Sequence, residues 1–109
     1  MVPDGYRLLS LQDDEGTIEA LAGFRIATNL YYGKHAWVYE LVTAETARSR
    51  GHGAMLLGHV EELAGAEGCE LVALSSGLQR LDAHRFYEDR MGYDRVSYCF
   101  TKPVPPKAG

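Results

Sequence analysis

One change in hydrophobic period divides this 109-residue sequence and limits the folds open to it. Up to Thr43, β-branched and aromatic side chains are frequent and no helical pattern is evident. Turn-forming residues at Asp13–Gly16 and Tyr31–Lys34 separate the apolar segments. We therefore expect an antiparallel meander of three strands, at residues 6–12, 17–29 and 35–43. Gly23, inside the second strand, marks either a β-bulge or a point of close packing.

The period becomes helical after the third strand. Within Gly53–Ala66, apolar residues recur at the spacing that places them on one face of a helix. The residues of this face are Leu56, Leu57, Val60, Leu63 and Ala64. Gly68 is placed to end the helix, because glycine accepts the left-handed conformation that often follows a last helical turn.

A second strand and helix follow. Leu71–Leu74 is short and fully apolar, which predicts a buried strand with a parallel neighbour. Asp82 is placed to cap a helix that runs to Met91, and Gly92 is placed to end it.

The last residues alternate only loosely in polarity. Residues 93–102 predict one or two short terminal strands, whereas the prolines within 103–109 predict a frayed tail. The resulting order, β-β-β-α-β-α-β(-β), indicates an α/β (α+β) domain in which helices pack on one mixed sheet. The length is typical of one domain, which we place over 1–109.

Composition excludes several classes of protein. Apolar residues make up 46% and charged residues 24% of the chain, as in ordinary globular proteins. The formal net charge of −4 argues against a general nucleic-acid binder. No apolar run approaches the roughly 20 residues of a membrane span, and the first residues lack signal-peptide character. Two cysteines, Cys69 and Cys99, are too few for a disulfide scaffold, so we expect a cytoplasmic location with both thiols reduced.

A glycine-rich turn, Arg48–Ala54, joins the third strand to the first helix. Gly51 and Gly53 let the backbone bend sharply and bring N–H groups toward a ligand at the positive end of the helix, which suits a pyrophosphate. The alternative is a glycine-rich loop that only turns a corner. The dinucleotide-binding pattern is excluded, because its third glycine would fall at Leu56. Positive character gathers in this turn at Arg48, Arg50 and His52.

Three segments in order resemble the GNAT superfamily of N-acetyltransferases. Arg48-x-x-Gly51-x-Gly53 matches its Q/R-x-x-G-x-G/A pyrophosphate signature. Glu40–Thr43 is similar to the family's strand before that turn, and Asp82–Tyr93 to its A-x-x-F-Y-x-x-x-G-F segment. The resemblance covers roughly residues 6 to 102 and implies a mostly antiparallel sheet and acetyl-CoA as acetyl donor. The four histidines form no metal-binding signature, so we expect no metal.

The resemblance also implies a set of donor-binding residues. Backbone N–H groups of the glycine-rich turn would hold the pyrophosphate, and backbone groups at the end of the third strand would hold pantetheine where two strands splay apart. These residues are Leu41, Val42, Thr43, Arg48, Arg50, Gly51, His52, Gly53 and Ala54.

Tyr87 matches the family tyrosine that hydrogen-bonds the departing sulfur. Because a phenol has a pKa near 10 and a thiol near 8.5, full proton transfer is uphill by roughly 2 kcal/mol. Tyr87 would therefore stabilise the thiolate by a hydrogen bond as much as act as an acid. The alternative is that Tyr87 packs in the core, although its neighbour Phe86 fits that role better.

Glu40 is the candidate base. An alkylamine with a pKa near 10.4 is mostly charged at pH 7, and neutralising it costs roughly 4.6 kcal/mol. A water relay would serve equally, and a solvated strand carboxylate is the structural alternative. Arg80 and Arg85 are either phosphate contacts or surface arginines. Aromatic residues that could wall an acceptor pocket, or simply pair across strands, are Tyr31, Tyr32, Trp37 and Tyr39.

The chain lacks the strand and two helices that usually precede Tyr6–Gln12 in this family and shape the acceptor site. It is a fragment, a form covered by a second copy, or a fold that binds CoA with little catalysis. We expect a homodimer, because even a few hundred Å² of exposed apolar face costs several kcal/mol at roughly 25 cal/mol per Å². The sequence thus predicts an N-acetyltransferase acting on a small-molecule primary amine. Its rivals are an acyl-CoA-binding module and, less well supported, a general phosphate-binding domain.

Overall fold

The computed structural model describes residues 5–44 and 51–106. The chain divides into two compact units, Met1–Ser75 and Ser76–Gly109, which we describe separately. The first unit contains β1 (Tyr6–Gln12), β2 (Ile18–Asn29), β3 (Gly33–Thr43), α1 (His52–Ala66) and β4 (Leu71–Leu74). The second contains α2 (Leu81–Arg85) and a π-helical turn, η2 (Phe86–Arg90). The predicted strands at the front of the chain are thus confirmed to within two residues.

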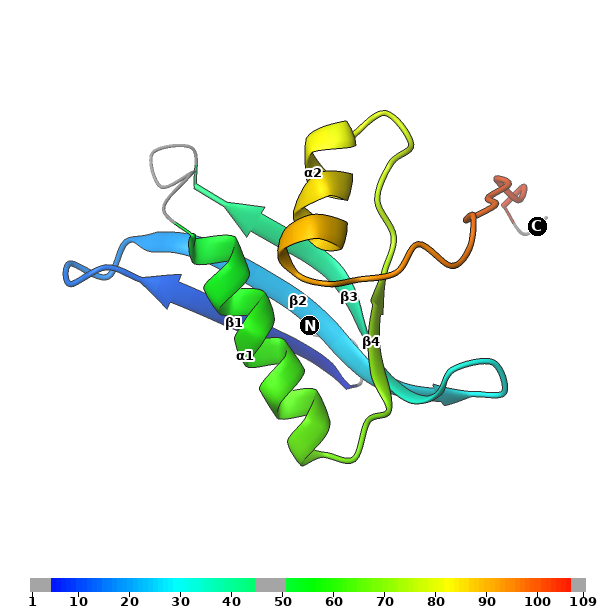
Figure 1. The fold of residues 1–109 in the computed structure, drawn as a ribbon, viewed down its shortest axis with the longest axis horizontal. Helices are drawn as coiled ribbons and strands as arrows, with labels where there is room; N and C mark the ends of the chain where they lie inside the picture. Colours follow the sequence, from blue (N-terminus) through cyan, green and yellow to red (C-terminus); the bar gives the residue numbers. More distant parts are fainter. Residues whose placement is uncertain (1–4, 45–50, 107–109) are drawn as a thin grey trace. The chain divides into compact units, whose positions relative to one another are not determined.

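The first unit is built on a four-stranded sheet in the order β1-β2-β3-β4. β1, β2 and β3 pair antiparallel, and β4 joins β3 in parallel. The helix α1 lies across one face of this sheet (Figure 1). The mixed, mostly antiparallel sheet with a helix packed on it confirms the predicted fold class.

The core of this unit lies between α1 and the two central strands. Small residues of β2, Ala20 and Ala22, lie in the same row of side chains as the fully buried Phe24 and let the helix approach the sheet closely. On the helix, the buried residues are Leu56, Leu57, Val60 and Ala64. Leu63, predicted on the same face, is instead 37% exposed, because it lies at the border of the buried stripe.

Local chemistry sets the turns of the first unit. In the β1–β2 hairpin, Asp13 Oδ1 accepts hydrogen bonds from the amides of Glu15 and Thr17, both at 2.9 Å. Gly68, with φ of 82°, ends α1 as predicted, and the Cys69 amide after it donates to the Ala64 carbonyl at 2.9 Å.

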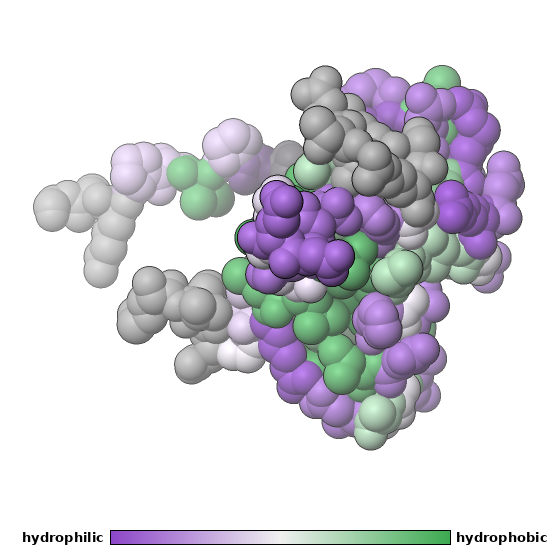
Figure 2. Space-filling view, turned by 90° about the vertical axis from the view of Figure 1, so that its left-hand side faces the viewer, coloured by the Kyte–Doolittle hydropathy of each residue, from purple (hydrophilic) through white to green (hydrophobic). Residues whose placement is uncertain are grey.

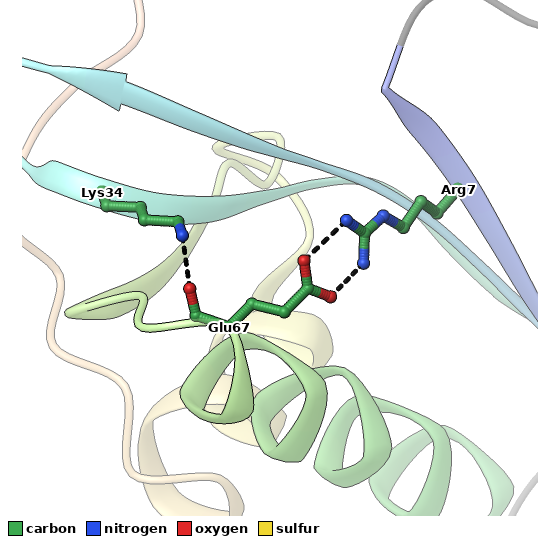
Figure 3. A network of polar contacts seen from close by, with 3 residues as sticks. All are labelled: Arg7, Lys34 and Glu67. Atoms are coloured by element: carbon green, nitrogen blue, oxygen red, sulfur yellow. Dashed lines mark hydrogen bonds and ion pairs between the residues drawn. The ribbon is translucent and has the colours of Figure 1, made fainter.

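Three polar side chains fix the carboxyl end of α1 to the sheet (Figure 3). Arg7 of β1 makes a two-pronged contact with Glu67, with Nη2 donating to Oε1 at 2.7 Å. Lys34 Nζ of β3 donates to the Glu67 backbone carbonyl. The hydrogen bond from Arg7 lowers the pKa of Glu67, although burial acts weakly in the other direction. The pair is exposed, so water and salt screen it.

Leu71–Leu74 forms the predicted strand with a parallel neighbour, β3, but the prediction that this strand is buried is wrong. Within the described part of the chain, β4 is the last strand of the sheet and pairs only with β3. Leu71 is 37% exposed for that reason. An apolar run of four residues therefore marks an edge strand here.

The second unit differs from its prediction at both ends. Asp82 does not cap α2: the cap is Arg80, and the Asp82 carboxylate in the first turn pairs with Arg85 instead. Gly92, with φ of 75°, ends the helical segment as predicted. Residues 93–106 contain no strand, so the predicted terminal strands are not formed in the described chain. The apolar side chains that would alternate on such a strand are exposed and give no burial to offset its ordering: Val96, Tyr98 and Phe100.

Apolar surface is not confined to one place. Figure 2 shows an apolar area, in green, bordered by polar residues on the side of the molecule that it presents. No helix of the described residues is long and apolar enough to cross a membrane.

Candidate active site

The first helix begins at the glycine-rich turn. Gly51 is the N-cap of α1 and has φ of 79°, a left-handed conformation that side chains with a Cβ rarely adopt. Its carbonyl accepts the first helical hydrogen bond, from the Met55 amide at 3.0 Å. Among the described residues no side chain caps the helix, and its first turn contains no acidic residue. The free amides at this end therefore suit an anion.

The remaining residues of the predicted pyrophosphate site differ in position and exposure. Gly53 and Ala54 lie in the first turn of α1 and are partly exposed. Arg48 and Arg50 lie outside the described residues. The His52 ring is largely buried and turns toward β2, with Nδ1 3.4 Å from Glu19 Oε2 in poor hydrogen-bond geometry. The His52 ring therefore faces the Glu19 carboxylate.

The pairing between β3 and β4 ends in the middle of β3. Their parallel pairing runs only from His35 opposite Leu71 to Val38 opposite Leu74. Beyond Val38, β3 stays paired with β2 as far as Thr43. In the described chain, one side of β3 is thus free of strand pairing along residues 39–43, which include Leu41, Val42 and Thr43. Free backbone groups in an extended strand suit an elongated ligand with amide groups.

A β-bulge lies where this divergence begins. Gly23 is opposite Glu40 but the next residue, Phe24, is opposite Val38, so Tyr39 is the extra residue of β3. A bulge bends the strand that carries it. Gly23 is also a point of close packing: a Cβ there would collide with Tyr6 Oη and Glu40 Oε2. Both predicted interpretations of Gly23 are therefore confirmed.

Glu40 lies on the sheet face opposite α1. The Tyr6 hydroxyl of β1 donates a hydrogen bond to Glu40 Oε2 across Gly23. The Tyr6 and Tyr39 rings lie 6.0 Å apart with an interplanar angle of 45°. The candidate base is thus held in an aromatic setting.

The predicted aromatic wall does not form as one surface. Tyr31 and Tyr32 stack on each other at the β2–β3 turn, with ring centroids 4.7 Å apart. From Tyr32 to Tyr39 the strand runs roughly 20 Å at about 3.3 Å per residue. Of these aromatics, Tyr39 lies beside the bulge, and Trp37 is opposite Arg25.

Tyr87 belongs to the second unit. It lies in η2, where the Met91 amide bonds the Phe86 carbonyl at 3.0 Å and the Tyr93 amide bonds the Tyr87 carbonyl at 2.8 Å. Such wide turns are frequent at functional sites. Partial burial raises the pKa of the Tyr87 phenol, and nearby Arg80 opposes this to a smaller degree. The phenol is therefore neutral and able to donate a hydrogen bond at physiological pH.

The two arginines predicted as phosphate contacts or surface residues, Arg80 and Arg85, differ in their surroundings. Arg85 pairs with Asp82 and is not a free phosphate contact, whereas Arg80 lies near enough to Tyr87 to affect its pKa. Within residues 5–44 and 51–106, no group of three His, Cys, Asp or Glu side chains could hold a metal ion.

Sequence reasoning missed Tyr6 and Arg25. Both lie on the same face as Glu40, because Tyr6 is opposite Arg25 and Leu8 is opposite Gly23. The hairpin turn at residues 13–16 does not reveal this arrangement by itself, because the β1–β2 register shifts by one residue between Leu11 and Gln12.

Comparison with known proteins finds similarity to N-acetyltransferases. The sequence model of the "Acetyltransferase (GNAT) family" matches residues 2–93. The uncharacterized N-acetyltransferase YhdJ of Bacillus subtilis (strain 168) is 45% identical over 101 residues, which cover 93% of this chain and 70% of that protein. The aminoalkylphosphonate N-acetyltransferase of Salmonella typhimurium is 43% identical over 104 residues, which cover 94% of this chain and 65% of that protein.

Among solved structures, an acetyl transferase of Pyrococcus furiosus has the same fold. Its TM-score is 0.81 at 24% identity, and the match covers 91% of this chain and 66% of that one. The chain therefore spans about two thirds of the length of the proteins that it matches.

Proposed function

The chain belongs to the acetyltransferase (GNAT) family, and from that membership we propose that it transfers an acetyl group from acetyl-CoA to a primary amine. Relatives that are named N-acetyltransferases support the reaction class. The observation that carries the proposal is the pair of features flanking residues 45–50. These are the strand edge freed along residues 39–43 and the uncapped helix that begins after Gly51.

The donor would bind along these two features. Amides of Gly51, Gly53 and Ala54 would hold the pyrophosphate, with charge from Arg48 and Arg50. Backbone groups of Leu41, Val42 and Thr43 would pair with pantetheine. The fit is favourable because the first turn of α1 carries no carboxylate that would repel phosphate. Acetyl-CoA supplies the activated thioester.

Tyr87 would donate a hydrogen bond to the departing sulfur. Because burial raises the phenol pKa above its ordinary value, full proton transfer to a thiolate is uphill by more than the roughly 2 kcal/mol expected for unperturbed groups. Stabilisation of the developing charge, rather than full protonation, is the role that this environment favours.

Glu40 would accept and orient the acceptor amine. A carboxylate has about four lone-pair positions, so the bond from Tyr6 leaves room for an ammonium group. Neutralising an alkylamine of pKa near 10.4 at pH 7 costs roughly 4.6 kcal/mol. Glu40 would take up that proton or hold the first water of a relay that carries it away.

The acceptor is proposed to be a small molecule. The Salmonella relative is named for aminoalkylphosphonates, which are small primary amines, and this supports the class. We also propose that the protein works as a cytoplasmic homodimer. The exposed apolar side chains Leu8 and Val42, 54% and 55% exposed, support an apolar contact with a second copy.

Calorimetry with acetyl-CoA tests the donor site without requiring turnover. The wild type should bind, and Gly51→Ala should bind at least tenfold more weakly, because its left-handed backbone disfavours a Cβ. Gly58→Ala is the matched control, since a Cβ at that helical position meets open space. No heat with wild type, or equal affinities for the two variants, would refute the proposed donor site.

A further inference from the structure

We propose that the sheet face opposite α1 carries a two-point acceptor site, in which Glu40 binds the ammonium end and Arg25 binds an anionic group of the same small molecule. The inference rests on the proposed function and names its substrate class: primary amines that carry an acidic group. Tyr6 and Gly23 are the positioning residues of this site.

The ammonium end is built from three strands. Gly23 leaves a gap in the row of side chains, and the Tyr6 hydroxyl and the Glu40 carboxylate meet over it. The hydrogen bond holds a long, otherwise flexible carboxylate in one place. The Tyr6 and Tyr39 rings beside it add faces that attract a cation. A fixed carboxylate next to aromatic rings is a recognition site for ammonium.

The anionic end is Arg25. It lies two residues from Gly23 on β2, hence on the same face, and it is exposed. None of the ion pairs formed among the described residues includes Arg25. A guanidinium with no carboxylate partner in the described part of the chain retains its five donors for a phosphonate, phosphate or carboxylate.

The spacing between the two charges defines the ligand. Gly23, which is opposite Glu40, lies two residues from Arg25 on β2, and this spacing separates the α-carbons of Gly23 and Arg25 by roughly 7 Å. Arg25 leans further away, because its Nε lies 3.6 Å from the position of a Cβ on Gly5, beyond Tyr6. The opposite charges therefore stand apart, which explains why they do not neutralise each other. A short alkyl chain between amine and acid would bridge them.

Steady-state CoA release with two matched acceptors tests the site. One acceptor is 2-aminoethylphosphonate, and the other is its diethyl ester, which keeps the amine and loses the charge. Arg25→Gln should raise KM for the phosphonate at least tenfold and leave KM for the ester unchanged. Tyr6→Phe should raise KM for both acceptors by a similar factor, because it affects only the ammonium end. Arg90→Gln, an exposed arginine of the second unit, should change neither.

Two results would overturn the inference: a wild type that does not prefer the phosphonate to its ester, or an Arg25→Gln variant that weakens both acceptors equally. Calorimetric titration of the wild type and Arg25→Gln with 2-aminoethylphosphonate separates this from the proposed function. Binding that depends on Arg25 without acetylated product would refute the transferase and keep the site. Turnover of other amines without such binding would refute the site and keep the transferase.

Discussion

The phenolic hydroxyl of Tyr6 on β1 donates a hydrogen bond to the carboxylate of Glu40 on β3, over Gly23 of the strand between them. This contact links the first strand to the residue that we propose receives the amine. It exists because a glycine and a β-bulge coincide in the central strands. The first predictions concern this arrangement.

Gly23→Ala should disturb the acceptor site while the fold survives. Its Cβ would push aside the far ends of the Tyr6 and Glu40 side chains, which can rotate away. We expect kcat/KM to fall about tenfold, which is about 1.4 kcal/mol of transition-state binding, and the free energy of unfolding to change by no more than about 1 kcal/mol. Kinetics and urea denaturation measure the two. Gly58→Ala is again the control, and an unchanged kcat/KM for Gly23→Ala would contradict the role given to the pair.

Tyr87→Phe should lower kcat by about tenfold to a hundredfold, because a hydrogen bond to developing thiolate charge is lost. Burial raises the pKa of Tyr87, so the phenol stays protonated up to at least pH 10. The pH profile of kcat should therefore have the same shape below about pH 10 in the wild type and in Tyr87→Phe. If the variant instead removes an alkaline limb near pH 8, the phenol titrates in the working range and our account of it is wrong.

Glu67→Gln should lower the free energy of unfolding at neutral pH but not in acid. The hydrogen bond from Arg7 lowers the pKa of Glu67 in the folded state, so its stabilisation is present above the unfolded pKa, near 4.5. That stabilisation is lost as pH falls through the lower, folded value. Urea unfolding should show a difference in the free energy of unfolding between wild type and variant at pH 7, and this difference should shrink as the pH falls below about 4.5. Glu15→Gln, in the exposed hairpin turn, should show no such pH-dependent difference.

Leu57→Ala and Leu63→Ala compare two leucines of the same helix. Leu57 is fully buried, so its truncation should cost about 2–5 kcal/mol, as for other core leucines. Leu63 is 37% exposed, so Leu63→Ala should lower the free energy of unfolding by clearly less than Leu57→Ala. Chemical denaturation decides the order, and equal losses would show that Leu63 packs as fully as the helical periodicity predicted.

The sequence predicts the front of the fold well, because the determinants there are local. Alternating apolar residues and the Asp13–Gly16 turn set β1 and β2, and Gly68 ends α1 through its own backbone preference. Asp82 shows the limit of such reasoning. An aspartate suited to capping pairs with Arg85 instead, and only the three-dimensional arrangement decides between these partners.

The site is predictable only in part. Glu40 and Gly51 stand out by motif, and the conformation of Gly51 is what the turn requires. The contact between Tyr6 and Glu40 joins residues 34 positions apart, and a bulge shifts the register between β2 and β3. Because one residue of register reverses the face of every side chain, strand pattern alone does not bring these two together.

Product analysis is the most direct test of the central claim that the chain is an acetyltransferase. The wild type is incubated with acetyl-CoA and a panel of small primary amines, and both free CoA and acetylated amine are quantified by mass spectrometry. We predict equal amounts of the two products for at least one amine, and a clearly lower rate for Tyr87→Phe. Acetyl-CoA binding without acetylation of any amine would contradict the claim and identify an acyl-CoA-binding module.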